Sequence, residues 1–155
     1  MDRQGCESRK ILCGRPRGAT SIISPVLLCR DFGQFLDGCQ TCEGTAADNQ
    51  FVLELSKLMS KYYQCEDDRA AQIRTHFINW GLKFNPSTVG NNYRTDGDLR
   101  VGPYRYAIIE AKNEIGTGGG DPYAQAGFYY LESTRDIAPM NDSVLPCFII
   151  NIFGR

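Results

Sequence analysis

Apolar residues recur at helical spacing in two stretches near the middle of the chain. Between residues 49 and 63 they return every three to four positions, which predicts an amphipathic helix capped by Asp48 or Asn49. Residues 66–80 repeat this pattern and begin with three acidic residues, which the dipole of a helix favours at its N-terminus. The sequence therefore predicts a pair of helices in this region.

Short apolar runs predict strands on both sides of this helix pair. Residues 98–102 and 104–112 form two strands joined by a tight turn, and residues 147–153 form a strand that we expect to be buried on both faces. An earlier run, residues 22–29, contains a proline and fits an edge strand or an extended segment best. Residues 38–47 read as a loop between this strand and the helix pair.

A third helix is expected between the paired strands and the last strand. Asp121 suits the N-cap position and Pro122 the first helical position, and the helix should continue to about Glu132. A glycine-rich run, residues 116–120, precedes it and reads as a loop beside the strand end. The order of elements predicts a small α/β domain with a mixed sheet flanked by helices.

The organisation of the domain follows from the same pattern. Residues 1–19 are polar and predict a flexible N-terminal arm, and residues 20–155 form a single domain with its core at about residues 48–154. The last apolar strand ends two residues before the end of the sequence. Two alternatives stay open: a complete small fold, or one piece of a longer protein that is truncated soon after a core strand.

Composition and charge exclude some classes of protein. The 155 residues carry 17 basic and 18 acidic side chains, so the formal net charge is -1 and the chain lacks the basic excess typical of many nucleic-acid-binding domains. No apolar run is long enough to span a bilayer, so no membrane partner is expected. Seven cysteines without a secretory signal predict reduced thiols and an intracellular location, cytoplasmic or nuclear. Cys39 and Cys42 suggest zinc or redox chemistry. The alternative is a loop that carries two free thiols.

Charged residues at the ends of the paired strands carry the candidate chemistry. Glu110 and Lys112 are two apart in a strand and therefore share a face. A carboxylate and an ammonium at the end of an apolar strand are costly unless they meet each other, a metal ion or water. Asp98 on the neighbouring strand could converge with Glu110 on a divalent cation, with Lys112 beside them to hold a phosphate oxygen or steer water. The alternative is a structural salt bridge between Glu110 and Lys112, with Asp98 in a turn.

Asp96 competes with Asp98 for the first position of this site. We favour Asp98, because it opens the alternation of Leu99 and Val101 and so belongs to the strand. On the third predicted helix, Gln125 and Tyr129 are four apart and share one face. Alternatively, Gln125 and Tyr129 form a buried hydrogen bond within the helix layer. The neighbouring Phe128 and Tyr130 are expected in the core.

Taken together, Asp98, Glu110-x-Lys112 and Gln125-x-x-x-Tyr129 resemble the restriction-endonuclease-like PD-(D/E)xK nucleases. The sequence of residues 108–130 is also similar to the nuclease-like region found beside kinase-like domains in fungal Crinkler-type proteins. The resemblance covers roughly residues 51–154 and departs from the family pattern at Gly97, where the family has proline.

The resemblance implies an αβββαβ core and phosphodiester hydrolysis that depends on Mg²⁺ or Mn²⁺. Asp98, Glu110 and the backbone carbonyl of Ala111 would bind the metal, and Lys112 would orient or help to deprotonate the attacking water. Gln125 and Tyr129, by the same resemblance, would position the phosphate backbone or the lysine. The implied partner is nucleic acid, with DNA as the expected form.

Two further points stay open at the level of sequence. The family sometimes places an acid on the first helix, which makes Glu54 a candidate for a water-mediated metal contact, although a solvated helix position explains it as well. The alternative function is a catalytically silent nuclease-fold module that binds nucleic acid or a partner protein, or regulates an adjacent kinase-like domain. Basic residues near the site in sequence could form a rim for phosphates or a solvated face: Lys83, Arg94, Arg100 and Arg105.

Overall fold

The computed structural model describes residues 24–90, 93–114, 121–142 and 145–154. The chain divides into two compact units, Met1–Gly38 and Cys39–Arg155. The predicted limit of the N-terminal arm at residue 19 and the glycine run 116–120 lie outside the described residues.

Most of the described part of the first unit is helical, and its second helix continues beyond Gly38. Pro25–Leu28 forms the short helix α1, so the strand predicted over residues 22–29 is wrong for these residues. Proline suits the first turn of a helix, where its missing N–H removes no hydrogen bond, and this explains the difference. Helix α2 spans Arg30–Thr41 and extends into the region expected to be a loop from residue 38.

The second unit opens with the predicted helix pair. Helix α3 spans Ala46–Met59 and helix α4 spans Glu66–Asn79, so both predicted helices are confirmed. The cap of α3 lies earlier than predicted: the Thr45 side chain accepts a hydrogen bond from the backbone N–H of Asp48, and the Asp48 carboxylate accepts one from the backbone N–H of Thr45. This reciprocal capping box satisfies two N–H groups that would otherwise lack partners.

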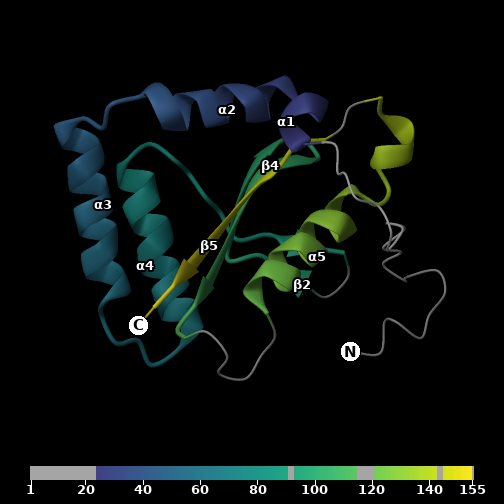
Figure 1. Cartoon of the computed structure of the whole chain (residues 1–155). Coiled ribbons are helices and arrows are strands. Elements are labelled where there is room, and N and C mark those ends of the chain that lie inside the picture. The colour runs from purple at the N-terminus through teal and green to yellow at the C-terminus, as the bar shows by residue number, and fades with distance from the viewer. Residues whose placement is uncertain (1–23, 91–92, 115–120, 143–144, 155) are drawn as a thin grey trace, which may run out of the picture. The chain divides into compact units, whose positions relative to one another are not determined.

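A small mixed sheet forms the centre of the second unit (Figure 1). Its strands are β3 (Gly97–Val101), β4 (Tyr104–Lys112) and β5 (Phe148–Phe153), in the order β3-β4-β5. Strands β3 and β4 are antiparallel, whereas β4 and β5 are parallel. The remaining elements are the two-stranded ladder of β1 (Thr88–Val89) and β2 (Tyr93–Arg94), helix α5 (Pro122–Thr134) and the short helix η3 (Ala138–Met140).

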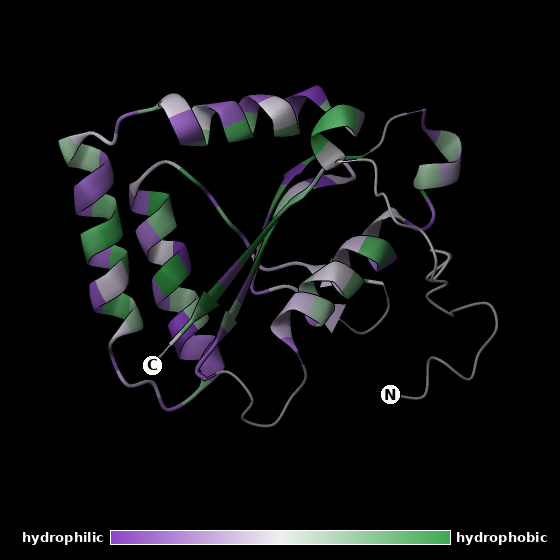
Figure 2. Ribbon diagram, viewed as in Figure 1, coloured by the Kyte–Doolittle hydropathy of each residue, from purple (hydrophilic) through white to green (hydrophobic). Residues whose placement is uncertain are grey.

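Helices cover both faces of this sheet, with α3 and α4 on one side and α5 on the other (Figure 1). Ile73 and Phe77 of α4 pack with Ile109 in one buried cluster, and Tyr129 of α5 packs with Ile108 in a second one. Neighbouring residues of a strand point to opposite faces, so β4 supplies both clusters in alternation. Figure 2 shows the hydrophobic colour along the two long strands between these layers.

The last strand is less buried than its sequence suggests. Strand β5 lies at the edge of the described sheet and has β4 as its neighbour, and Ile149 is 40% exposed. Burial on both faces instead belongs to β4, where residues 107–111 are all buried, because β4 is the central strand and α4 and α5 cover its two faces. The prediction of an α/β fold with a small mixed sheet is confirmed. None of the described helices combines the length and apolar character needed to cross a bilayer.

Candidate functional site

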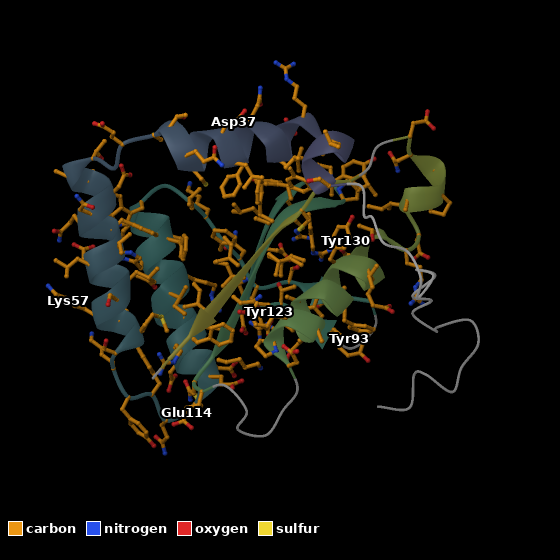
Figure 3. All side chains as sticks on the ribbon, viewed as in Figure 1. Asp37, Lys57, Tyr93, Glu114, Tyr123 and Tyr130 are labelled. Atoms are coloured by element: carbon orange, nitrogen blue, oxygen red, sulfur yellow. The ribbon has the colours of Figure 1, made fainter. Side chains whose placement is uncertain are left out.

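Charged side chains gather at the end of β4, where Glu110 and Lys112 share the face that α5 covers. Glu110 is 1% exposed, and its Oε1 lies 3.4 Å from Nζ of Lys112. The same Nζ lies 3.0 Å from Oε2 of Glu66, the first residue of α4. The lysine therefore bridges two carboxylates from different elements. Figure 3 labels Glu114, two residues beyond Lys112, and so marks this end of the strand.

Asp96 lies at the same end of the sheet. Its Oδ2 accepts a 2.8 Å hydrogen bond from the backbone N–H of Ala111, and its own carbonyl accepts one of 2.6 Å from Nη1 of Arg74. The strand register explains this placement. Gly97 pairs with Ile109, so the residue before Gly97 falls opposite Glu110.

Asp98 occupies a different, arginine-rich environment. Its Oδ2 lies 2.9 Å from Nε of Arg105 and accepts hydrogen bonds from the hydroxyls of Ser87 and Thr95, and its Oδ1 lies 3.2 Å from Nε of Arg100. This carboxylate is 1% exposed, and its described partners do not include the residues around Lys112.

The structure therefore brings Asp96, rather than the favoured Asp98, beside Glu110. The two aspartates alternate with Gly97 and so share a face, which is why the pattern alone could not separate them. The difference arises from the pairing of the strands, since Asp98 stands opposite Ile108.

Burial and like charge make the two carboxyl groups reluctant to ionise together. Burial, reinforced by the charge of Asp96 and opposed by Lys112, raises the pKa of Glu110 to about 7. Burial also raises the pKa of Asp96, although the hydrogen bond from Ala111 opposes it. In addition, Oε2 of Glu110 is buried without a hydrogen-bond partner among the described residues. A cation beside these oxygens would relieve both the repulsion and the missing partner.

Lys112 is held in its charged form. Burial alone would lower the pKa of its ammonium group, but Glu66 and Glu110 outweigh that effect and the pKa is raised. Lys112 is therefore an ammonium donor at neutral pH and not a proton acceptor.

Gln125 and Tyr129 meet on α5 as their spacing predicts. Nε2 of Gln125 donates a 2.6 Å hydrogen bond to the hydroxyl of Tyr129. Tyr129 as a whole residue is 6% exposed. Burial raises the pKa of Tyr129, and the charges of Glu110 and Asp96 add to the shift, so this hydroxyl lies within electrostatic reach of the carboxylates. Tyr129 also packs in the core, so the hydrogen bond within the helix layer, the competing account, is present as well.

Other candidates lie away from this group. Glu54 accepts a hydrogen bond from Gln50 and lies 3.7 Å from Nδ1 of His76, with its side chain 42% exposed. Cys39 and Cys42 are exposed free thiols. On α5, Tyr130 is half-buried and donates its hydroxyl to the carbonyl of Leu145 (Figure 3).

Glu66 is a member of the group that the sequence did not identify. Its position at the start of α4 suited the helix dipole and so had an explanation without Lys112. The contact joins residues 46 positions apart, and periodicity along the chain does not report on such a pair.

The donor set at this site is suited to a cation but small. Across the described residues, no group of three His, Cys, Asp or Glu side chains is arranged to hold a metal ion. Two carboxylates, those of Asp96 and Glu110, lie together, and the carbonyl of Ala111 points to the Asp96 side because the N–H and C=O of one strand residue point the same way. These are oxygen donors, which Mg²⁺ and Mn²⁺ prefer, and the unpartnered oxygen of Glu110 fits such an ion.

No protein-family model, curated protein or solved structure matches this chain.

Proposed function

We propose that this protein is a metal-dependent nuclease that hydrolyses phosphodiester bonds in nucleic acid, with DNA as the expected substrate. The observation that carries the proposal is that half-buried Asp96 and buried Glu110 lie together at the end of β4, with the ammonium of Lys112 beside Glu110. In this proposal Asp96, Glu110 and Lys112 would take the places of the D…ExK residues of a restriction-endonuclease-like core, with Asp96 instead of Asp98.

Asp96 and Glu110 are the proposed ligands for Mg²⁺ or Mn²⁺, together with the carbonyl of Ala111. The metal ion would supply positive charge that polarises a phosphate oxygen and a bound water. Both carboxyl groups must ionise to bind the ion. Their pKa values are raised without a metal, and a bound cation would lower them by stabilising the ionised forms. Asp98 has a structural role in this account, because its carboxylate is already neutralised by arginine.

Lys112 would stabilise negative charge on the scissile phosphate. Its raised pKa keeps it protonated, which suits a donor to a phosphate oxygen or to the attacking water and not a base that removes a proton. Glu66 holds the ammonium over the site at 3.0 Å. Gln125 and Tyr129 would orient the phosphate backbone from α5, since their hydrogen-bonded side chains lie on that face of the sheet.

A hollow beside Asp96 supports the nucleic-acid assignment. Arg74 and Arg94 line it, and their guanidinium groups could contact a phosphate next to the one that is cleaved. Asp67 also lines this hollow and would weaken its attraction for anions.

The second candidate is a catalytically silent module of the same fold that binds nucleic acid or a partner protein, or regulates an adjacent kinase-like domain. The observation in its favour is that Lys112 already contacts both Glu110 and Glu66, which gives the carboxylates a counter-ion without a metal.

Cleavage assays separate the two candidates. The full chain is incubated with circular plasmid and single-stranded DNA in Mg²⁺ or Mn²⁺, beside Lys112→Met and the matched control Lys57→Met. Lys57 is exposed on α3, away from the site (Figure 3). We expect cleavage by the wild type and the control, and a loss of at least 100-fold in Lys112→Met, as for removal of a key charge-stabilising donor. Equal cleavage by all three proteins would contradict the nuclease assignment, and no cleavage by any would favour the silent module.

A further inference from the structure

Strand β5 carries one polar residue within an otherwise apolar sequence, FIINIF. That residue, Asn151, pairs in register with Glu110 of the parallel neighbour β4. Side chains at paired positions of parallel strands project from the same face, with the strands about 4.8 Å apart. Asn151 and Glu110 are therefore direct neighbours on the face that α5 covers.

Both residues have an oxygen atom without a partner. Among the described residues, four buried side-chain polar atoms lack a hydrogen bond, and two of them are Oε2 of Glu110 and Oδ1 of Asn151. An unpaired buried polar group is costly, and an apolar residue would fit the pattern of β5 better at position 151. Two such atoms on adjacent positions indicate a shared partner that both can bind.

The chemistry of that partner follows from the two atoms. An ionised carboxylate oxygen and an amide oxygen both accept hydrogen bonds, so neither satisfies the other while Glu110 is ionised, whereas a hard cation accepts electron pairs from both. Asp96 and Glu110 are the two proposed carboxylate ligands, Glu66 is paired with Lys112, and no group of three His, Cys, Asp or Glu side chains among the described residues is arranged to hold a metal ion. An amide oxygen from β5 would enlarge the donor set without adding a charge that must be ionised.

We propose that Asn151 supplies its side-chain oxygen as a ligand to the divalent cation held by Asp96 and Glu110. The proposal rests on the cation site of the proposed function and extends it from β4 to β5. It makes the last strand a functional part of the site.

Two variants of Asn151 test this assignment in the full chain. Asn151→Leu removes the oxygen at similar volume, and Asn151→Asp keeps an oxygen at the same place. Ile149→Val, on the same face of β5, is the control for altered packing of the strand. Mn²⁺ affinity is measured by calorimetry at pH 8.5, where Glu110 is ionised, and far-ultraviolet circular dichroism verifies the fold of each variant.

We expect Asn151→Leu to weaken Mn²⁺ binding by roughly tenfold or more, and Asn151→Asp and Ile149→Val to bind at least as tightly as the wild type. Unchanged affinity in Asn151→Leu would overturn the proposal. So would equal weakness of both Asn151 variants, since the amide would then act as a hydrogen-bond donor to Glu110 and not as a ligand.

Calorimetry also separates this inference from the proposed activity. If Mn²⁺ binding depends on Asn151 but the protein cleaves no DNA, Asn151 is supported as a ligand and the proposed nuclease activity is contradicted. If the protein cleaves DNA but its Mn²⁺ affinity is unchanged by substitutions at position 151, the nuclease activity is supported and Asn151 is contradicted as a ligand. A wild type that binds no Mn²⁺ would overturn both.

Discussion

The backbone N–H of Ala111 donates a 2.8 Å hydrogen bond to Oδ2 of Asp96, and this contact fixes the candidate site. It ties the segment before β3 to the end of β4. The Asp96 carboxylate consequently lies near the carboxylate of Glu110, the residue before Ala111 on β4. Residues 107–111 of this strand are all buried.

Asp98 should be important for stability and not for cation binding. Asp98→Ala leaves Arg105 buried without its carboxylate partner, and the side chains of the pair are 1% and 8% exposed. We expect the free energy of unfolding to fall by roughly 2–4 kcal/mol, because a buried charge without its partner is strongly destabilising. Urea denaturation measures the change.

The double variant Asp98→Ala/Arg105→Met provides the control for this pair. Removal of both charges should recover part of the loss, since neither partner is then left buried alone. Losses that simply add would show that the two side chains are not coupled and would contradict the structural role.

Glu110 should make the metal-free protein less stable as pH rises. Its pKa is near 7 in the folded protein and near 4.5 in the unfolded chain, so the folded state binds more protons between these values. Stability then decreases as pH rises through this window and stays reduced above pH 7. Glu110→Gln removes the titration and should be more stable than the wild type by roughly 1–3 kcal/mol at pH 8 in EDTA.

Thermal unfolding of both proteins from pH 4.5 to 8.5 checks this sign. The advantage of Glu110→Gln should shrink when Mg²⁺ is added, because the ion stabilises the ionised wild type and not the variant. An advantage that is independent of pH would mean that Glu110 ionises normally in the fold.

Gly154 should be required for the packing of the chain at the end of β4. Arg69 is 2% exposed and donates 2.8 Å and 2.9 Å hydrogen bonds to Oδ1 of Asn113 and the carbonyl of Met59. A methyl group at position 154 would overlap the Arg69 guanidinium and the carbonyl of Asn113. We expect Gly154→Ala to lower the free energy of unfolding by roughly 1–3 kcal/mol.

Gly127 on α5 offers the matched substitution. An added methyl there meets no atom within 4 Å beyond the adjoining residues and the neighbouring backbone of α5, so Gly127→Ala should raise stability by about 0.5–1 kcal/mol through helix propensity. The two alanine variants should therefore shift the urea midpoint in opposite directions, and shifts of the same sign would contradict the packing described for Arg69.

The sequence predicts local elements well where periodicity and caps agree. The bounds of β4 and the Asp121–Pro122 start of α5 follow from residues close together in the chain. The pattern failed at Pro25, where an apolar run that includes a proline fits a helix start as well as an edge strand.

Pairing between distant segments could not be predicted in the same way. The choice of Asp96 over Asp98 depends on the register of β3 against β4, and two residues of the same face give the same alternation. The contact of Glu66 with Lys112 and the neighbourhood of Asn151 and Glu110 depend on the arrangement of whole elements. A pattern of apolar and polar positions contains no information about either.

The most direct test of the central claim is a calorimetric titration of Mn²⁺ into Asp96→Asn and Asp98→Asn beside the wild type. Each variant removes one negative charge at nearly constant volume from aspartates two residues apart. We predict that Asp96→Asn loses binding and that Asp98→Asn, verified as folded, retains the affinity of the wild type. Loss of binding in Asp98→Asn with retention in Asp96→Asn would contradict the site described at the end of β4.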